Sequence, residues 1–331
     1  MNLAIVGATG LVGRTFLDMI EREHIQYDAL YLFASPRSAG KTLEFQGKTY
    51  TVMALTEANV RAHQMDVALF SAGSQVSKDF AGIFIDNGAL VIDNSSAFRM
   101  DKKVPLIVPE VNLEDVGNSR LIANPNCSTI QSVLPLKVVE GLSPITRVDF
   151  TTYQAVSGSG QKGLLELART SQGEKPKIYP YPIYNNVIAQ IDRFLDDGFT
   201  FEEEKMIRET QKILGKDHLA VSATCVRVPV EHAHSVSMMI ETESEIDLQD
   251  LRRAFMRSDG IRLVDETDEC QFPTPLAAVD QGDVLVGRLR VDRFLKTKIH
   301  LFCTADNILK GAALNAVQIL KRIQEEGEIY V

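Results

Sequence analysis

In the first third of the chain, short apolar runs alternate with stretches in which the apolar residues have helical spacing. This order is typical of a parallel sheet with helices on both faces. The pattern therefore predicts a doubly wound, Rossmann-type domain over residues 1–127. The expected strands are Leu3–Val6, Leu30–Ala34, Asp66–Ser71, Ala89–Asp93 and Leu106–Val108.

After residue 127 the pattern changes. A helical stretch over Thr129–Glu140 is followed by longer segments in which apolar and polar residues alternate, as in strands with one face in water. Residues 128–306 are therefore expected to form an α+β domain with a mixed, largely antiparallel sheet. Its expected strands are Arg147–Val156, His218–Val230, His234–Glu243, Val284–Val291 and Lys298–Thr304.

Two further segments have clear patterns. Three prolines make Ser171–Asn186 a loop. Apolar residues at helical spacing over Asn307–Gly327 predict a long terminal helix. We expect residues 307–331 to return to the first domain and complete it.

Composition narrows the classes of function. The chain has 331 residues, 45% of them hydrophobic, which is enough for two cores. A net charge of −9 argues against nucleic acid or an anionic membrane surface as the main partner. Four cysteines without a CxxC pair indicate neither a zinc site nor a disulfide framework. With no basic leader and no apolar run of membrane-spanning length, we expect a cytoplasmic protein.

A glycine-rich loop follows the first expected strand and begins an expected helix. Glycines at this position permit a tight turn and let backbone N–H groups approach a pyrophosphate. The spacing predicts a dinucleotide site, although a tight turn without a ligand remains an alternative. The residues concerned are Gly7, Thr9, Gly10, Leu11, Val12 and Gly13.

The end of the second expected strand bears on the choice of cofactor. NAD-binding domains place an acidic residue there to hold the ribose, but this chain has Ser35, Arg37 and Ser38 and no acid. A cation with two hydroxyls suits a 2′-phosphate, so NADP is favoured over NAD. The alternative is a solvated basic turn.

Cys127 lies in Asn-Pro-Asn-Cys-Ser-Thr, between an apolar stretch and an expected helix. Unpaired N–H groups and the positive end of a helix dipole favour the thiolate, the nucleophilic form of cysteine. We therefore expect Cys127 to attack carbon and form a thioester. A buried, inert thiol is the competing interpretation.

His232 and His234 stand two positions apart at the start of an expected strand, so they should project to the same face. Either imidazole could serve as acid and base near neutral pH. Such a pair is also half of a metal site, but no third ligand is apparent, and we expect no metal.

Read together, these motifs give the chain a close resemblance to the aspartate-β-semialdehyde dehydrogenase family along nearly its whole length. The resemblance implies reversible, NADP-dependent, phosphate-consuming oxidation of L-aspartate 4-semialdehyde to L-4-aspartyl phosphate. In cells the family runs toward the semialdehyde, for lysine, threonine, methionine and isoleucine synthesis, as a homodimer or homotetramer. The matching stretches are Gly7–Gly13, Ser35–Lys41, Ser71–Ser74, Asp93–Arg99, Val108–Asn112, Asn124–Thr129, Thr152–Gly158, Cys225–Val230, His234–Ser235 and Asp306–Ala313.

The resemblance also assigns roles. It makes Cys127 the nucleophile, selects His234 as the acid and base, and has Gln154 orient the carbonyl. Substrate and phosphate contacts fall on Arg99, Glu202, Lys205 and Arg227, and contacts to the nicotinamide end of NADP on Ser157, Gly158 and Asn307. From the residues alone, the Glu202–Lys205 pair could equally be a solvated surface ion pair, and Gln154 a structural amide.

Two other functions remain open. A relative acting on N-acetylglutamyl phosphate would share the thioester chemistry, but its cysteine usually follows glycine and its substrate has no free ammonium for Glu202. A non-catalytic NADP-binding paralogue should have lost the nucleophile or the base. Glu166–Asn186 is shorter than in the family, which leaves dimer and tetramer both possible.

Overall fold

The computed structural model describes residues 1–325, and the chain divides into two units. Unit 1 comprises Met1–Pro125 together with the segment that begins at Ala312, and unit 2 comprises Asn126–Gly311. The last two residues of the expected terminal helix, 326 and 327, lie outside the described residues. No helix within residues 1–325 is long and apolar enough to cross a membrane.

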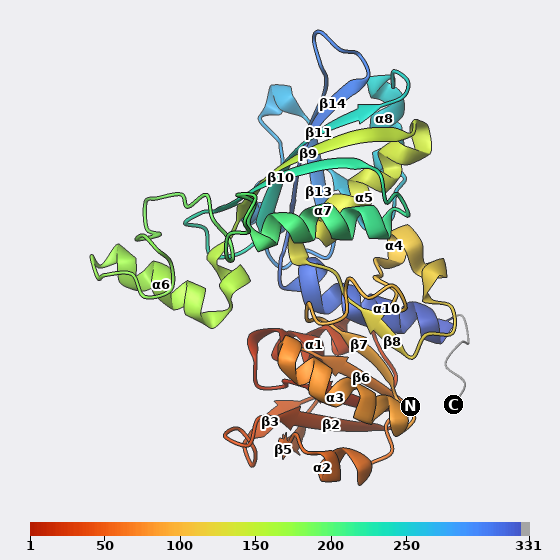
Figure 1. Cartoon of the computed structure of the whole chain (residues 1–331), viewed down its shortest axis with the longest axis vertical. Coiled ribbons are helices and arrows are strands. Elements are labelled where there is room, and N and C mark those ends of the chain that lie inside the picture. Colours follow the sequence, from red (N-terminus) through yellow and green to blue (C-terminus); the bar gives the residue numbers. More distant parts are fainter. Residues whose placement is uncertain (326–331) are drawn as a thin grey trace. The chain divides into compact units, whose positions relative to one another are not determined.

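Unit 1 contains a six-stranded parallel sheet, which confirms the predicted Rossmann-type fold (Figure 1). The strand order β5-β2-β1-β6-β7-β8 reverses between β1 and β6, and ligands of such sheets bind beyond the carboxyl ends of the strands at that point. The strands are β1 (Asn2–Val6), β2 (Ala29–Ala34), β5 (Met53–Ala54), β6 (Val67–Phe70), β7 (Leu90–Asp93) and β8 (Leu121–Ala123).

Helices cover the sheet of unit 1, with α1 beside α10 and α2 beside α3. In the core, the ring of Phe84 meets Phe33 and Phe70 edge to face, with centroids 5.7 and 5.1 Å apart. This geometry is a favourable one for aromatic pairs. The helices are α1 (Leu11–Arg22), α2 (Glu57–Arg61), α3 (Ser74–Asp86), α4 (Pro109–Asn112) and α10 (Leu314–Glu325).

Several strands of unit 1 differ from the sequence prediction. The expected strand Leu106–Val108 is wrong, because only Leu106 makes a bridge, to Ala123, and prolines precede and follow the three residues. Its apolar side chains are buried in a loop, which explains the strand-like signal. The hairpin of β3 (Thr42–Phe45) and β4 (Lys48–Thr51) was not predicted, and neither was the short edge strand β5.

Unit 2 contains the expected mixed sheet, in the order β10-β9-β11-β14-β13-β12. The outermost pairs, β10 with β9 and β12 with β13, are parallel, and the three pairs between them are antiparallel. The strands are β9 (Ile145–Gln154), β10 (Ala220–Arg227), β11 (His234–Thr242), β12 (Ile261–Leu263), β13 (Val284–Val291) and β14 (Lys298–Ala305).

One face of this sheet is covered by α5 (Cys127–Leu142), α7 (Phe201–Ile213) and α8 (Leu248–Met256) (Figure 1). The other face carries Tyr153, Met239 and Phe302, which are half-buried or exposed. The alternation predicted for these strands is therefore present. Two helices in unit 2, α6 (Gln161–Ser171) and α8, were not predicted, and unit 2 also has the four-residue helix α9 (Pro275–Ala278).

Residues 172–200 contain only isolated bridges, in agreement with the predicted loop. A buried carboxylate from α6 organises the start of this segment: Glu166 Oε1 accepts the backbone N–H groups of Lys177 and Ile178, at 2.5 and 2.7 Å. Burial would raise the pKa of Glu166, but these N–H groups outweigh it and hold the pKa below its usual value.

Candidate active site

Cys127 is the first residue of α5, at the helix start that the sequence predicted. No acidic residue lies in the first turn of α5, so the positive end of the helix dipole can favour a thiolate. Burial raises the pKa of the Cys225 and Cys303 thiols, whereas Cys127 is only half-buried. The surroundings therefore make Cys127 the better nucleophile of these three.

Asn126 fixes the start of α5. Its Oδ1 caps the helix by accepting the N–H groups of Ser128 and Thr129, at 2.9 and 3.4 Å. Its Nδ2 donates to Glu202 Oε1 at 2.9 Å, and its backbone N–H donates to Glu209 Oε2 at 2.6 Å. The residue before the nucleophile is thus held at three points.

The carboxylates of Glu202 and Glu209 come from one face of α7, because the seven positions between these residues correspond to about two helical turns. Sequence reasoning selected Glu202 but missed Glu209, which is only 1% exposed. The signal that could have identified Glu209 is its spacing of seven from Glu202 within the helical pattern that the sequence shows over Phe201–Leu214. A second buried acid at that spacing implies a polar partner on the facing element.

Glu202 is the centre of a buried polar network. It accepts from Asn126 and Gln154 on Oε1 and from the Lys205 ammonium on Oε2, the last two at 3.2 and 3.1 Å. Burial would raise the pKa of Glu202, but Lys205 and the two amides outweigh it, so the pKa lies below its usual value. Because Glu202 is 5% exposed, the surface ion-pair interpretation is wrong.

Three predicted residues meet at one end of the unit 2 sheet. Arg227 at the end of β10 pairs with Gln154 at the end of β9, and β11 begins beside them at His234. The backbone of Ala155 joins them: its N–H donates to His234 Nδ1 at 3.0 Å, and its carbonyl accepts from Arg227 Nη1 at 2.7 Å.

His234 and Arg227 are 0% and 4% exposed, and burial together with the Arg227 charge holds the pKa of His234 well below its usual value. Within residues 1–325, neither His234 Nε2 nor Arg227 Nε has a hydrogen-bond partner. A Cβ on Gly158 would lie 2.8 Å from Arg227 Nη1 and 3.0 Å from His234 Nε2. The glycine therefore leaves room beside two buried polar groups.

The expectation that His232 and His234 share a strand face is wrong. Strand β11 begins at His234, and Ala233 before it has φ of +69°, which breaks the alternation. Asn307 Oδ1 holds this turn by accepting the Ala233 N–H at 3.0 Å and the Ser157 hydroxyl at 3.1 Å. The residues predicted to meet the nicotinamide end, Ser157, Gly158 and Asn307, thus lie beside His234.

The loop 172–200 adds side chains that sequence reasoning missed. Tyr179 places its ring centroid 5.9 Å from Arg227 Cζ, and Asp192 accepts from Lys205 at 3.0 Å. Ile188 also exchanges two backbone hydrogen bonds with Arg227. No periodic pattern marks an irregular segment, so the sequence offered no signal for these contacts.

In unit 1, the glycine loop joins β1 to α1 with little spare space. Gly7 has φ of +89°, and a Cβ there would lie 2.3 Å from the Ser71 carbonyl oxygen. A Cβ on Gly13 would lie 2.1 Å from the Gly7 oxygen. Gly10 caps α1 without a side-chain hydrogen bond, and the first turn, which includes Leu11 and Val12, has no acid. The loop therefore fits a pyrophosphate at a helix N-terminus.

The turn after β2 holds Ser35, Arg37 and Ser38, with the Ser38 N–H donating to the Ser35 carbonyl at 2.8 Å. Arg37 is exposed and no acid follows the strand, which fits a 2′-phosphate. Arg99, also in unit 1, is 8% exposed. It donates to the carbonyls of Asn124 and Asn94, at 2.9 and 3.0 Å, which orient its guanidinium.

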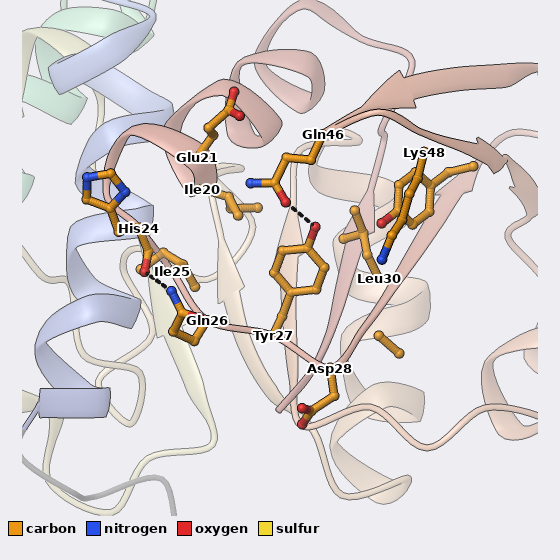
Figure 2. Close-up of a pocket in the computed structure, with 12 residues that line it drawn as sticks. Ile20, Glu21, His24, Ile25, Gln26, Tyr27, Asp28, Leu30, Gln46 and Lys48 are labelled. Carbon is orange, nitrogen blue, oxygen red and sulfur yellow. Dashed lines mark hydrogen bonds between the residues drawn. The ribbon is translucent and has the colours of Figure 1, made fainter.

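A pocket of about 760 Å³ lies in unit 1 between the end of α1 and the β3–β4 hairpin. Figure 2 shows its polar lining, in which the Tyr27 hydroxyl donates to Gln46 Oε1 at 2.9 Å. None of the predicted site residues lines this pocket. Across residues 1–325 there is no group of three or more His, Cys, Asp or Glu side chains that could hold a metal ion.

Comparison with known proteins gives two family matches. Residues 2–119 match the model described as semialdehyde dehydrogenase, NAD binding domain. Residues 136–310 match the model described as semialdehyde dehydrogenase, dimerisation domain. Together the two models cover most of the chain.

Full-length relatives agree with these matches. The chain is 47% identical to an aspartate-semialdehyde dehydrogenase of Aquifex aeolicus, over 99% of each protein. It is 43% identical to that of Campylobacter jejuni, over 97% of this chain and 96% of the relative. Among solved structures, aspartate semialdehyde dehydrogenase II of Vibrio cholerae in complex with ASA superposes with a TM-score of 0.93, at 42% identity and 98% coverage of each chain.

Proposed function

Because this chain belongs to the aspartate-semialdehyde dehydrogenase family, we propose that it interconverts L-aspartate 4-semialdehyde and L-4-aspartyl phosphate, using NADP and inorganic phosphate. The observation that carries the proposal is one connected set of contacts in unit 2. It runs from the helix start at Cys127 through Asn126 and Glu202 to Gln154. The next residue, Ala155, then contacts both Arg227 and His234.

In the oxidative direction, the Cys127 thiolate adds to the aldehyde carbon, forming a C–S bond and an alkoxide. The nicotinamide of NADP, when bound, supplies the acceptor for the hydride that leaves this carbon. Loss of the hydride lets the oxygen re-form the C=O bond, and the product is a thioester with Cys127. A phosphate oxygen then attacks the thioester, the C–S bond breaks, and the thiolate is restored with release of the acyl phosphate.

The charges of the candidate site match the ends of this substrate. Arg227 is suited to the α-carboxylate, since guanidinium groups bind carboxylates through parallel hydrogen bonds. The charged Glu202 carboxylate suits the α-ammonium, and Lys205 and Arg99 suit the phosphate. A charged acid at position 202 favours a free amino group over an N-acetylated substrate.

Three segments are assigned to NADP. Its pyrophosphate would bind the glycine loop from Gly7 to Gly13, and its 2′-phosphate the turn with Ser35, Arg37 and Ser38. Its nicotinamide end would meet Ser157, Gly158 and Asn307. We further propose that two copies of the chain associate through residues within 136–310, the region that matches the dimerisation model.

The deciding experiment is an assay of NADPH formation from the semialdehyde, with and without phosphate or arsenate, and with NAD in place of NADP. We expect turnover to require the oxyanion and to prefer NADP. Cys127→Ser should abolish it, while Cys270→Ser, which changes an exposed thiol, should not. Phosphate-independent turnover, or an active Cys127→Ser enzyme, would refute the covalent route. N-acetylglutamate semialdehyde as competitor tests the related substrate.

The metabolic role that follows is a step toward lysine, threonine, methionine and isoleucine. Loss of the protein should therefore make growth depend on these amino acids or their precursors. Growth of a deletion strain without them would contradict this role, while leaving the assayed chemistry untouched.

A further inference from the structure

Arg99, the proposed phosphate contact of unit 1, is held by two backbone carbonyls at the ends of neighbouring strands. Its Nε donates to the Asn124 carbonyl at 2.9 Å and its Nη2 to the Asn94 carbonyl at 3.0 Å. Asn94 follows β7 and Asn124 follows β8, and these two strands are paired. The guanidinium is a planar, rigid fork, so two acceptors on it fix the orientation of the whole group.

The side chains of the same two asparagines are joined to each other and to the terminal helix. Asn124 Nδ2 donates to Asn94 Oδ1 at 2.7 Å and to the Ala312 carbonyl at 3.1 Å. Asn124 Oδ1 accepts from Asn315 Nδ2 at 2.7 Å, and the same Nδ2 donates to the Ile107 carbonyl at 3.0 Å. Asn124 and Asn315 are fully buried. The three asparagines therefore form a continuous series of side-chain amides, the asparagine chain.

The direction of each amide in the asparagine chain is determined by backbone groups that can only accept. The Ile107 carbonyl requires the NH₂ group of Asn315, whose second hydrogen then serves Asn124 Oδ1. The Ala312 carbonyl requires the NH₂ group of Asn124, whose second hydrogen then serves Asn94 Oδ1. Because an unmatched buried carbonyl is costly, these contacts favour one arrangement of all three side chains.

An unusual stretch of backbone brings Asn315 to this position. Leu309–Ala313 forms a π-helix, and α10 begins immediately after it at Leu314. Such turns are rare and are frequent at functional sites. The π-helix supplies the Ala312 carbonyl and the first turn of α10 supplies Asn315, so both contacts to the Asn124 side chain come from this junction.

We propose that Asn315 is a positioning residue for the phosphate step: through Asn124 it holds the Arg99 guanidinium in the orientation that receives phosphate. The proposal rests on the function proposed above, which assigns Arg99 to phosphate. Guanidinium groups bind oxyanions through parallel hydrogen bonds, so the tilt of the group determines how well phosphate is bound. Loss of Asn315 should therefore weaken the use of phosphate while sparing the semialdehyde, whose proposed contacts are Arg227 and Glu202 of unit 2.

Steady-state kinetics of NADPH formation test this selectivity. Leucine has the branched shape of asparagine but no donor. Asn315→Leu should lower kcat/KM for phosphate by about 10- to 10²-fold and leave KM for the semialdehyde and for NADP within about twofold of the wild type. Lys321→Ala is the matched control on α10, because it removes the 3.0 Å ion pair with Glu23 and leaves the asparagine chain in place. Equal losses for all three substrates, or the same loss in Lys321→Ala, would refute the proposal.

A double-mutant cycle tests whether Asn315 acts through Arg99. Arg99→Lys removes the guanidinium that the asparagine chain orients. In that background, adding Asn315→Leu should change kcat/KM for phosphate by less than about twofold, since residues that act as one unit are not additive. Losses that add in full would mean that Asn315 acts by another route, and would overturn the proposal.

Hydrogen exchange of the Arg99 Nε–H gives a readout that needs no turnover. It is followed by NMR of the ¹⁵N-arginine-labelled, full-length protein, in which the Arg99 signal is the one lost in Arg99→Lys. Exposed Arg322 of α10, identified in the same way, is the reference for rapid exchange. We expect slow exchange at Arg99 in the wild type, and exchange about tenfold faster in Asn315→Leu. Wild-type exchange as rapid as that of Arg322, or an unchanged rate in the variant, would overturn the proposal.

A milder substitution covers the case in which Asn315→Leu does not fold, as judged by circular dichroism. Asn315→Ser keeps one donor in place of two and should show intermediate exchange at Arg99 and an intermediate kcat/KM for phosphate. Wild-type values of both quantities in a folded Asn315→Ser protein would refute the role of Asn315.

The two proposals fail separately. An absence of phosphate-dependent NADPH formation would refute the proposed function, and the exchange measurement would still decide whether Asn315 orients Arg99. Conversely, an active enzyme whose Asn315→Leu variant has the wild-type kcat/KM for phosphate would retain the proposed function and refute the role of Asn315.

Discussion

Two interactions of the Asn126 side chain hold the start of α5, and substitutions at this position can measure the contribution of each. Its Oδ1 caps α5, and its Nδ2 donates to the buried carboxylate of Glu202. Asn126→Ser keeps a capping hydroxyl but is too short to reach Glu202. Asn126→Ala removes both interactions. The backbone N–H to Glu209 is present in all three proteins.

The expected magnitudes follow from general values for these two kinds of interaction. A side-chain cap contributes about 1 kcal/mol to stability. A hydrogen bond to a charged acceptor contributes about 2 kcal/mol, since removal of the donor leaves a buried carboxylate less satisfied. The free energy of unfolding should therefore fall by about 2 kcal/mol in Asn126→Ser and by about 3 kcal/mol in Asn126→Ala.

The assay is urea unfolding followed by far-UV circular dichroism, because the chain has no tryptophan. Alkylation of Cys127 by iodoacetamide at fixed pH gives a second readout. It should slow more in the alanine variant, where the start of α5 frays and the thiolate loses the aligned N–H groups. If the two variants are equally stable, the cap contributes nothing. If the serine variant matches the wild type, the link to Glu202 contributes nothing.

Two further predictions concern the neighbouring residues. Gly158→Ala should lower kcat/KM by about 10²-fold while leaving the circular dichroism spectrum unchanged. The reason is that the added Cβ would lie 2.8 Å from Arg227 Nη1 and 3.0 Å from His234 Nε2. An unchanged kcat/KM would contradict this crowding. Because the folded-state pKa of His234 is depressed, its contribution to stability is complete above the unfolded pKa of about 6.5 and is lost as the pH falls below it. Urea unfolding from pH 7.5 to 5.5 should therefore show a steeper loss in the wild type than in His234→Gln, and equal slopes would refute the shift.

Features that depend on local pattern could be read from the sequence. Continuous apolar runs located the central strands of unit 1, and glycine spacing located the turn after β1. The motifs around Cys127 pointed to a helix start and to the family that the comparisons confirm. Each of these signals lies within a few consecutive residues.

Features that depend on distant partners could not be read. Glu209 looks like an ordinary polar residue of α7 until Asn126, 83 positions earlier, is seen to donate to it. The pairing of His232 with His234 failed because one left-handed residue, Ala233, breaks the period that the expectation assumed. Leu106–Val108 is buried like a strand but has prolines on both sides, and burial alone does not make a ladder.

The buried carboxylate of Glu166 has a consequence for where this chain can accept a foreign peptide. One carboxylate anchors the irregular segment at Lys177 and Ile178, while residues 172–176 between helix and anchor form no regular structure. Because the anchor does not depend on the length of that stretch, we expect a foreign peptide inserted there to leave the approach of Tyr179 to Arg227 in place.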